Sequence, residues 1–394
     1  MSPSPETHLR PARRAAASIF FVEGMVLANA FLRLPDFDSG FERGTLAYGL
    51  ALAPFSTGAI LAGLAAAPLL RRFGSARVAV ALGIGVGVCF LGAGLAPGWP
   101  VLAAMLLVAG GVEAIAAVAR NACGLQLQRL AGRSLLNSLY AVSTLGGLLG
   151  GVIGAAASAL HVPVALHLGA IALLAAGLLV SALPHLTGLS APVGEASPGG
   201  ASTDRRGLAF GIAALAGIGF AGALVDDVAN AWAGDAAEAS ALGASVAGIA
   251  FIAFVAAQLG GQLFGDRVVD RFGHRPIAQA GSAIACVGMG AALLLPSAPA
   301  TIFGFLLAGL GVATLLPAAM RGADELPGLR PGTGLTVVRW LVAFAFLVAA
   351  NLALVSDAEG SRAALYVGPL ACGVAAVLLG LLPTARPVAD PNGT

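Results

Sequence analysis

The chain has 394 residues, of which 58% are hydrophobic and only 10% charged, against roughly 25% charged in an average soluble protein. A soluble globule of this size needs more ionised surface groups than 21 basic and 19 acidic residues, so a water-soluble fold is excluded. A formal net charge of +2 indicates no nucleic-acid partner. The 55 glycines suit helices that pack closely in lipid. The four cysteines lie apart in apolar stretches and predict neither a disulfide nor a metal site.

Apolar runs separated by proline, glycine and charge clusters predict twelve membrane-spanning helices, because each crossing needs about 20 apolar residues. The first six are expected near 16–34, 45–70, 77–97, 100–121, 136–160 and 163–184. The second six are expected near 207–232, 241–265, 276–296, 299–320, 333–355 and 363–383. The polar segment 185–206 is typical of a flexible linker. The chain is therefore predicted to divide into an N-terminal half, 1–184, and a C-terminal half, 207–394.

Arginine gathers on one side of these predicted spans. If the N-terminus is cytoplasmic, most of the arginines fall in inner connections and tails, whereas the outer loops carry mainly acidic residues. The positive-inside rule then places both termini and the linker in the cytoplasm. Glu23 interrupts the first apolar run and no small-residue cleavage site follows, which favours an uncleaved first span over a signal peptide. We expect a multi-pass protein of a bacterial inner membrane.

Short segments recur in the two halves. Residues 71–74 read Arg-Arg-Phe-Gly after the second span, and residues 270–273 read Asp-Arg-Phe-Gly after the eighth. Asn29 in the first span and Asn230 in the seventh both lie in an Ala-Asn-Ala triplet. The nearly equal offsets indicate an internal duplication. Since each half has an even number of spans, the two repeats are predicted to be parallel, related by an axis along the membrane normal.

The stretch from Gly265 to Arg275, with two Asp-Arg pairs and a glycine inside it, resembles the loop signature of the major facilitator superfamily of secondary transporters. The resemblance covers essentially the whole chain and implies an all-α polytopic membrane protein with twelve transmembrane helices in two six-helix parallel pseudo-repeats. In such a loop a carboxylate at a helix end meets an arginine and the positive end of a neighbouring helix, forming a latch that breaks when the cytoplasmic side opens. The predicted latch residues are Gly265, Asp266, Asp270, Arg271, Gly273 and Arg275. The alternative is a set of charges that only fixes orientation, and Arg71 replaces the aspartate in the first half, which argues against a symmetric second latch.

Two further segments, residues 31–35 and 132–140, resemble recurring segments of the bacterial sugar-permease-like branch, whose substrates are mostly unknown. Polar positions of that branch are replaced here by Ala117 in span four and by Ala221 in span seven. The substrates of that branch are therefore not carried over to this chain.

Ionisable side chains inside the predicted spans are candidates for function, because a charge at the bilayer centre costs at least about 2.5–3.5 kcal/mol on insertion scales. Glu23 lies in span one, and Glu113 and Arg120 lie in span four, two turns apart on one helical face. We expect the three to form a polar cluster in which a carboxylate accepts the coupling proton and Arg120 holds its charge or an anionic group of the substrate. Alternatively, Arg120 snorkels to water at the cytoplasmic end of its helix.

The second half carries a similar set. Asp226 and Asp227 are adjacent in the outer third of span seven and diverge by about 100° on a helix, so one of them is expected to face a cavity; the alternative is a charge pair wetted at the outer mouth. Arg339 in span eleven is expected to bind an anionic group or to snorkel. The predicted proton-coupling residues are Glu23, Glu113 and Asp226, and the predicted substrate-binding residues are Asn29, Arg120, Asp227, Asn230 and Arg339.

Span five carries glycines at 146, 147, 150, 151 and 154. Small residues at this spacing form ridges that allow close helix packing. We expect a close-packing seam there, along which the two halves rock.

No Walker loop, metal-spaced histidine set or nucleophile motif occurs in the sequence, so we expect no enzyme, no metal and no cofactor. We predict a secondary active transporter that moves a small organic solute across the cytoplasmic membrane by alternating access, coupled to protons and functional as a monomer. Efflux of a hydrophobic or amphipathic compound is preferred, because the predicted cavity has few polar groups. The alternatives are an uptake permease for a sugar or organic acid, and a transport-inactive membrane sensor with the same fold.

Overall fold

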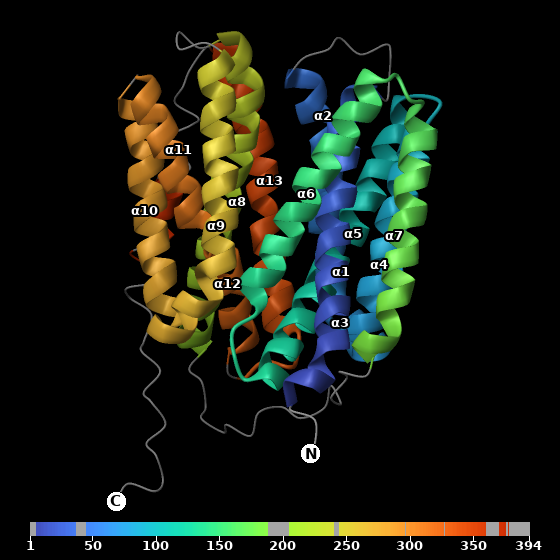
Figure 1. Ribbon diagram of the computed structural model, residues 1–394, viewed down its shortest axis with the longest axis vertical. Coiled ribbons are helices and arrows are strands. Elements are labelled where there is room, and N and C mark those ends of the chain that lie inside the picture. Colours follow the sequence, from blue (N-terminus) through green and yellow to red (C-terminus); the bar gives the residue numbers. More distant parts are fainter. Residues whose placement is uncertain are drawn as a thin grey trace, which may run out of the picture.

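The computed structural model is a bundle of long helices (Figure 1). It describes residues 5–36, 45–187, 205–239, 244–295, 297–326, 328–359, 370–375 and 377. Within these residues the regular structure is helical and no β-strand occurs. Most of the predicted linker 185–206 and of the predicted twelfth span 363–383 lies outside the described residues. Ten helices in the described part are long and apolar enough to cross a membrane.

The first group of helices precedes the predicted linker. It consists of α1 (Pro5–Leu32), α2 (Thr45–Ala62), α3 (Ala66–Phe73), α4 (Ser75–Gly94), α5 (Trp99–Ala131), α6 (Leu136–Ala159) and α7 (Val164–Thr187), with short 3₁₀ turns η1 (Leu34–Asp36) and η2 (Gly63–Ala65). The second group consists of α8 (Arg205–Ala239), α9 (Ala244–Phe272), α10 (His274–Leu294), α11 (Ala298–Val312), α12 (Leu315–Asp324) and α13 (Thr333–Glu359).

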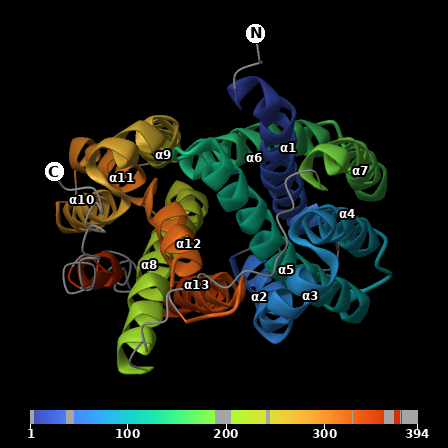
Figure 2. The ribbon, with the colours of Figure 1, turned by 90° about the horizontal axis from the view of Figure 1, so that it is seen from below.

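Helices α1 to α7 pack mainly on one another, and so do helices α8 to α13. The two groups meet along two seams, where α6 lies against α9 and α2 lies against α13. Figure 2 shows the groups side by side when the bundle is seen from the end that carries the N-terminus. This end of the bundle, which holds the start of α1 and of α6, is called the terminal end below.

The repeated Arg-Phe-Gly segments adopt the same geometry in both groups. The guanidinium carbon of Arg72 lies 5.2 Å from the ring centre of Phe73, and that of Arg271 lies 5.3 Å from the ring centre of Phe272. The glycines that follow have φ of 83° and 86°, a backbone region that glycine enters without steric cost. Each glycine ends one helix and starts the next, so the sequence repeat encodes the same sharp helix connection twice.

Two of the predicted single spans are interrupted. The span expected at 45–70 changes to a 3₁₀ turn at Gly63, where an added Cβ would lie 3.1 Å from the indole of Trp340. The span expected at 299–320 breaks between α11 and α12. By contrast, α5, the helix at the corresponding position of the first group, continues unbroken.

The glycine seam of α6 lies on α1. A methyl group at Gly146 would overlap the carbonyl of Phe21, and one at Gly150 would overlap the carbonyl of Met25. Both partners belong to the same group as α6, so the prediction that the two halves rock along this seam is wrong. The glycines bring the backbones of α1 and α6 close together, as small residues do in lipid.

Candidate functional site

The guanidinium of Arg120 in α5 lies between two carboxylates. Its Nη2 is 3.0 Å from Oε1 of Glu23 in α1 and 3.1 Å from Oε1 of Glu113 in α5. Ser143 of α6 donates a hydrogen bond of 2.5 Å to Oε2 of Glu23. Arg120 is 7% exposed and Glu113 is 6% exposed, so Arg120 pairs inside the bundle instead of snorkelling to water.

An aromatic platform supports this cluster on the side of α1 and α6. The guanidinium carbon of Arg120 lies 5.6 Å from the ring centre of Phe20, within the range of a cation–π contact. Phe20 packs edge-on against Tyr140, whose hydroxyl donates to Oδ1 of Asn121 at 2.9 Å. Because these partners come from α1, α5 and α6, the packing of three helices fixes the orientation of Arg120.

The carboxylates of the cluster line a cavity of about 80 Å³ between the two helix groups. Arg339 and Trp340 of α13 line the same cavity from the opposite side. Most of the remaining lining is apolar, and the residues are Leu27, Phe31, Phe55, Ser56, Ala59, Gly63, Gly110, Ala114, Val118 and Ala343. The structure thus brings three of the residues predicted from sequence, Glu23, Glu113 and Arg339, to one cavity, which we call the central cavity.

A second, smaller cavity of about 20 Å³ lies within the first group. Glu23 and Glu113 line this cavity too, but here Arg120 joins them and Arg339 does not. The other lining residues are Ile19, Val22, Val26, Leu27, Ala79, Gly83, Val86 and Leu179. We call this space the inner cavity. The two carboxylates therefore stand between the central cavity and the inner cavity.

Trp340 links the groups beside the central cavity. Its indole Nε1 donates a hydrogen bond of 2.7 Å to the carbonyl of Ile60. This carbonyl lies in the last turn of α2, next to the 3₁₀ turn that starts at Gly63. The interruption of the helix there frees a carbonyl for a partner from the other group.

The aspartates predicted in span seven line neither cavity. Oδ1 of Asp226 accepts a hydrogen bond of 3.0 Å from Gln258. Oδ2 of Asp227 is buried and accepts no hydrogen bond from the described residues, although Arg339 interacts with this carboxylate electrostatically.

The two predicted asparagines do not extend the site. Asn29 is fully buried and donates a hydrogen bond of 2.8 Å to the carbonyl of Met25, one turn earlier in α1. It packs at Gly150 of α6 and lines neither cavity, so its contacts are those of a helix interface. The side chain of Asn230 lies outside the described residues.

Near the terminal end, Asp266 of α9 binds the start of α6. Its Oδ1 accepts hydrogen bonds from the backbone N and the Nδ2 of Asn137, both at 3.0 Å. Its Oδ2 accepts from the backbone N of Ser138 at 2.9 Å and from the hydroxyl of the same residue. Four donors from the first group thus surround one carboxylate of the second group at a helix N-terminus, where the helix dipole favours a negative charge.

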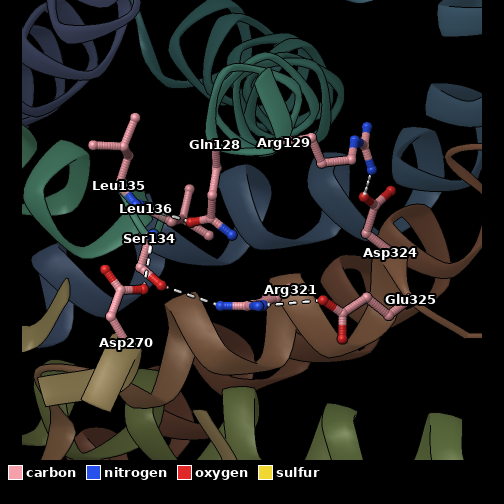
Figure 3. A network of polar contacts seen from close by, with 9 residues as sticks. All are labelled: Gln128, Arg129, Ser134, Leu135, Leu136, Asp270, Arg321, Asp324 and Glu325. Atoms are coloured by element: carbon pink, nitrogen blue, oxygen red, sulfur yellow. Dashed lines mark hydrogen bonds and ion pairs between the residues drawn. The ribbon is translucent and has the colours of Figure 1, made fainter. Parts of the chain in front are cut away.

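Further polar contacts between the groups surround the start of α6 (Figure 3). Oδ1 of Asp270 accepts from the backbone N of Ser134 at 3.0 Å, and Arg321 of α12 donates to the hydroxyl of Ser134 at 3.2 Å. Arg129 of α5 forms an ion pair with Asp324 of α12. The sequence did not identify these partners, because serine and a backbone N–H carry no pattern of their own.

The other predicted latch residues have different roles. Gly265 lets α9 approach α6, because an added Cβ would lie 3.0 Å from the side chain of Asn137. Arg271 lies over the ring of Phe272. Gly273 supplies the positive φ between α9 and α10, and Arg275 lies in the first turn of α10.

Comparisons with known proteins agree with this architecture. Residues 16–192 match the family model described as "Transmembrane secretion effector". The uncharacterized transporter y4wD of Sinorhizobium fredii is 28% identical over 377 residues, which are 93% of this chain and 92% of that protein. An uncharacterized MFS-type transporter of Yersinia pestis is 25% identical over 92% of this chain and 88% of its own length.

Among solved structures, the major facilitator superfamily transporter FucP in its outward conformation superposes with a TM-score of 0.73. The match has 15% sequence identity and covers 94% of this chain and 98% of that one. The human organic anion transporter MFSD10 gives the same TM-score and identity and covers 96% of this chain and 100% of that one. These relatives and solved structures are transporters and not enzymes, and the chain is similar to the major facilitator superfamily of membrane transporters along nearly its whole length.

Proposed function

We propose that this protein moves a small amphipathic organic compound by proton-coupled alternating access, with efflux as the preferred direction. The observation that carries the proposal is the sharing of one guanidinium, that of Arg120, by Glu23 and Glu113 beside the central cavity. The distribution of arginine supports an inner-membrane protein with both termini in the cytoplasm. We further propose that the monomer is the functional unit.

The charge of the cluster supports proton coupling. When all three groups are ionised, the two carboxylates exceed the single guanidinium by one negative charge. Arg339 on the opposite wall of the central cavity offsets part of this charge. The remaining charge is costly inside a membrane protein, and protonation of one carboxylate removes it. The cluster is therefore built to bind one proton, and a change in water access or in substrate charge shifts its occupancy.

The contacts between the two groups support alternating access. Asp266 and Asp270 hold the start of α6 from the other group, and Arg129 pairs with Asp324 nearby. An opening of the terminal end separates these partners. Each aspartate then exchanges its donors for water, and a substrate that binds one of the two states more tightly shifts the balance between them.

The lining of the central cavity supports an amphipathic substrate. Phe31, Phe55 and Trp340 offer apolar surface for the hydrophobic part of such a substrate. Arg339 and Glu113 offer charge at the opposite walls, and Ser56 adds one buried hydroxyl. Recognition of a sugar needs many directed hydrogen bonds, and the described residues of this lining offer few polar groups. The description "Transmembrane secretion effector" of the matching family model favours efflux.

The test uses proteoliposomes that enclose a pH-sensitive dye, with tetraphenylphosphonium, benzoate and fucose as probes. We expect a saturable proton movement with an amphipathic probe, its loss in Glu113→Gln, and its retention in Asp36→Asn, a control carboxylate at the other end of the bundle. A response to fucose alone indicates the uptake permease. Probe binding that shifts the melting temperature without any flux indicates the sensor.

A further inference from the structure

The inner cavity is placed to serve the coupling carboxylates without passing through the substrate site. On α1 the inner cavity is lined from Ile19 to Leu27 and the central cavity from Glu23 to Phe31, so the inner cavity reaches about one turn further toward the terminal end. On α5 the inner cavity reaches Arg120, and the central cavity reaches back to Gly110. The two carboxylates thus have one cavity on each side.

The inner cavity contains a buried donor. Arg120 uses Nη2 for Glu23 and Glu113, but its Nε is buried and has no hydrogen-bond partner among the described residues. A buried N–H of this kind is usually satisfied by protein or by ordered water. The volume of about 20 Å³ exceeds the roughly 10–15 Å³ that one water requires. Arg120 as donor and the carboxylates of Glu23 and Glu113 as acceptors are the polar partners that such a water needs.

We propose that the inner cavity is a water site through which the coupling proton travels between the carboxylates and the terminal end, separately from the substrate. The proposal rests on the proton coupling proposed above. A proton arrives as hydronium and passes to a carboxylate oxygen of Glu113 or Glu23, which leaves a neutral water and a carboxylic acid. The reverse transfer returns the proton to water. No other bond forms or breaks.

In this arrangement the substrate and the proton reach the terminal end by different routes. A substrate in the central cavity leaves toward the terminal end only after Asp266, Asp270 and their partners separate. A proton on Glu113 passes to the water of the inner cavity between α1, α4, α5 and α7, all of which belong to one group. Ala79, Val86 and Leu179 form the apolar wall of this path, so their size sets the rate of proton passage.

The test fills or widens each cavity separately. Ala79→Val and Val86→Ile fill the inner cavity, Leu179→Ala widens it, and Ala343→Val fills only the central cavity. Proton entry into proteoliposomes is driven by a potassium diffusion potential and read with an enclosed pH dye, so it needs no substrate. Thermal-shift titration with tetraphenylphosphonium and benzoate measures probe binding in the same preparations.

We expect proton entry to slow several-fold in both filling variants and to rise in Leu179→Ala, with probe affinity unchanged. Ala343→Val is expected to weaken probe binding while proton entry stays at the wild-type rate. If both filling variants fold and still admit protons at the wild-type rate, the inner cavity is not the proton route. This outcome leaves the proposed coupling intact as long as substrate still drives proton movement. Absence of any proton movement in the wild-type protein overturns the proposed coupling itself.

Discussion

Oδ1 of Asp266 accepts hydrogen bonds from both the backbone N and the Nδ2 of Asn137 at 3.0 Å, although the two residues belong to different helix groups. The carboxylate acts as the N-terminal cap of α6, a role usually filled by a residue of the same helix. Asp266 therefore contributes both to the closure of the terminal end and to the stability of α6.

Replacement of Asp266 by alanine removes this cap and leaves the backbone N–H groups of Asn137 and Ser138 without their acceptor. Loss of a helix cap costs about 0.5–2 kcal/mol, and we expect the free energy of unfolding to fall by that amount. The terminal end also opens more often, so a cysteine introduced by Ala343→Cys reacts faster with a thiol reagent. Asp270→Ala, which removes one bond to Ser134, is the milder comparison. Equal labelling rates in wild type and Asp266→Ala would contradict the latch.

The two carboxylates of the polar cluster depend on Arg120. Arg120→Met keeps the volume but leaves Glu23 and Glu113 facing each other without a cation, and breaking a buried ion pair typically costs about 3–5 kcal/mol. Addition of Glu113→Gln to Arg120→Met removes one of the two stranded charges, so we expect the double variant to regain stability. Chemical unfolding in detergent gives the free energy of unfolding of the wild type, Arg120→Met and the double variant. A double variant less stable than Arg120→Met would show that the charges are not the cause.

Much of this cluster was predictable from sequence because charged residues are rare in lipid-facing helices. The seven-residue spacing of Glu113 and Arg120 places them on one face, and Arg120 pairs with both Glu113 and Glu23, as expected. Ser143 and Ser56 could not be identified, since a serine in a membrane helix often bonds its own backbone. The sequence predicts that one of the two aspartates of span seven faces a cavity, but neither lines one, and Asp226 accepts a hydrogen bond from Gln258 instead.

The latch shows a different limit. Its acceptors, Asp266 and Asp270, lie in a recognisable loop, but their partners are mainly backbone N–H groups at the start of α6. Every helix start offers such donors, so only the packing of α6 against α9 identifies the pair. The glycine ridge of α6 was recognised as a close-packing surface, but its partner, α1, depends on which helices are neighbours in space.

The bond from Trp340 to the carbonyl of Ile60 joins the groups at the central cavity. Trp340→Phe keeps an aromatic ring at the cavity wall and removes the N–H donor. We therefore expect the free energy of unfolding to fall by about 1 kcal/mol, the typical contribution of a hydrogen bond. Probe affinity is expected to change as well, because the ring lines the cavity. Thermal shifts with and without benzoate separate the two effects. Trp99→Phe, at the start of α5, serves as the matched substitution away from the cavity.

The two groups share a glycine contact that tests the duplication. A Cβ at Gly110 would overlap the carbonyl of Phe55, and one at Gly309 would overlap the carbonyl of Phe254. Overpacking costs about 1–3 kcal/mol, so Gly110→Ala and Gly309→Ala are each expected to lower the free energy of unfolding by a similar amount. At Gly177 in α7 nothing lies within 4 Å of an added Cβ, and Gly177→Ala is expected to be neutral or stabilising by about 0.5–1 kcal/mol. Unfolding of the three variants in the same detergent measures these changes in the free energy of unfolding. A loss at Gly110 without one at Gly309 would mean that the repeated sequence no longer performs the same packing role in both groups.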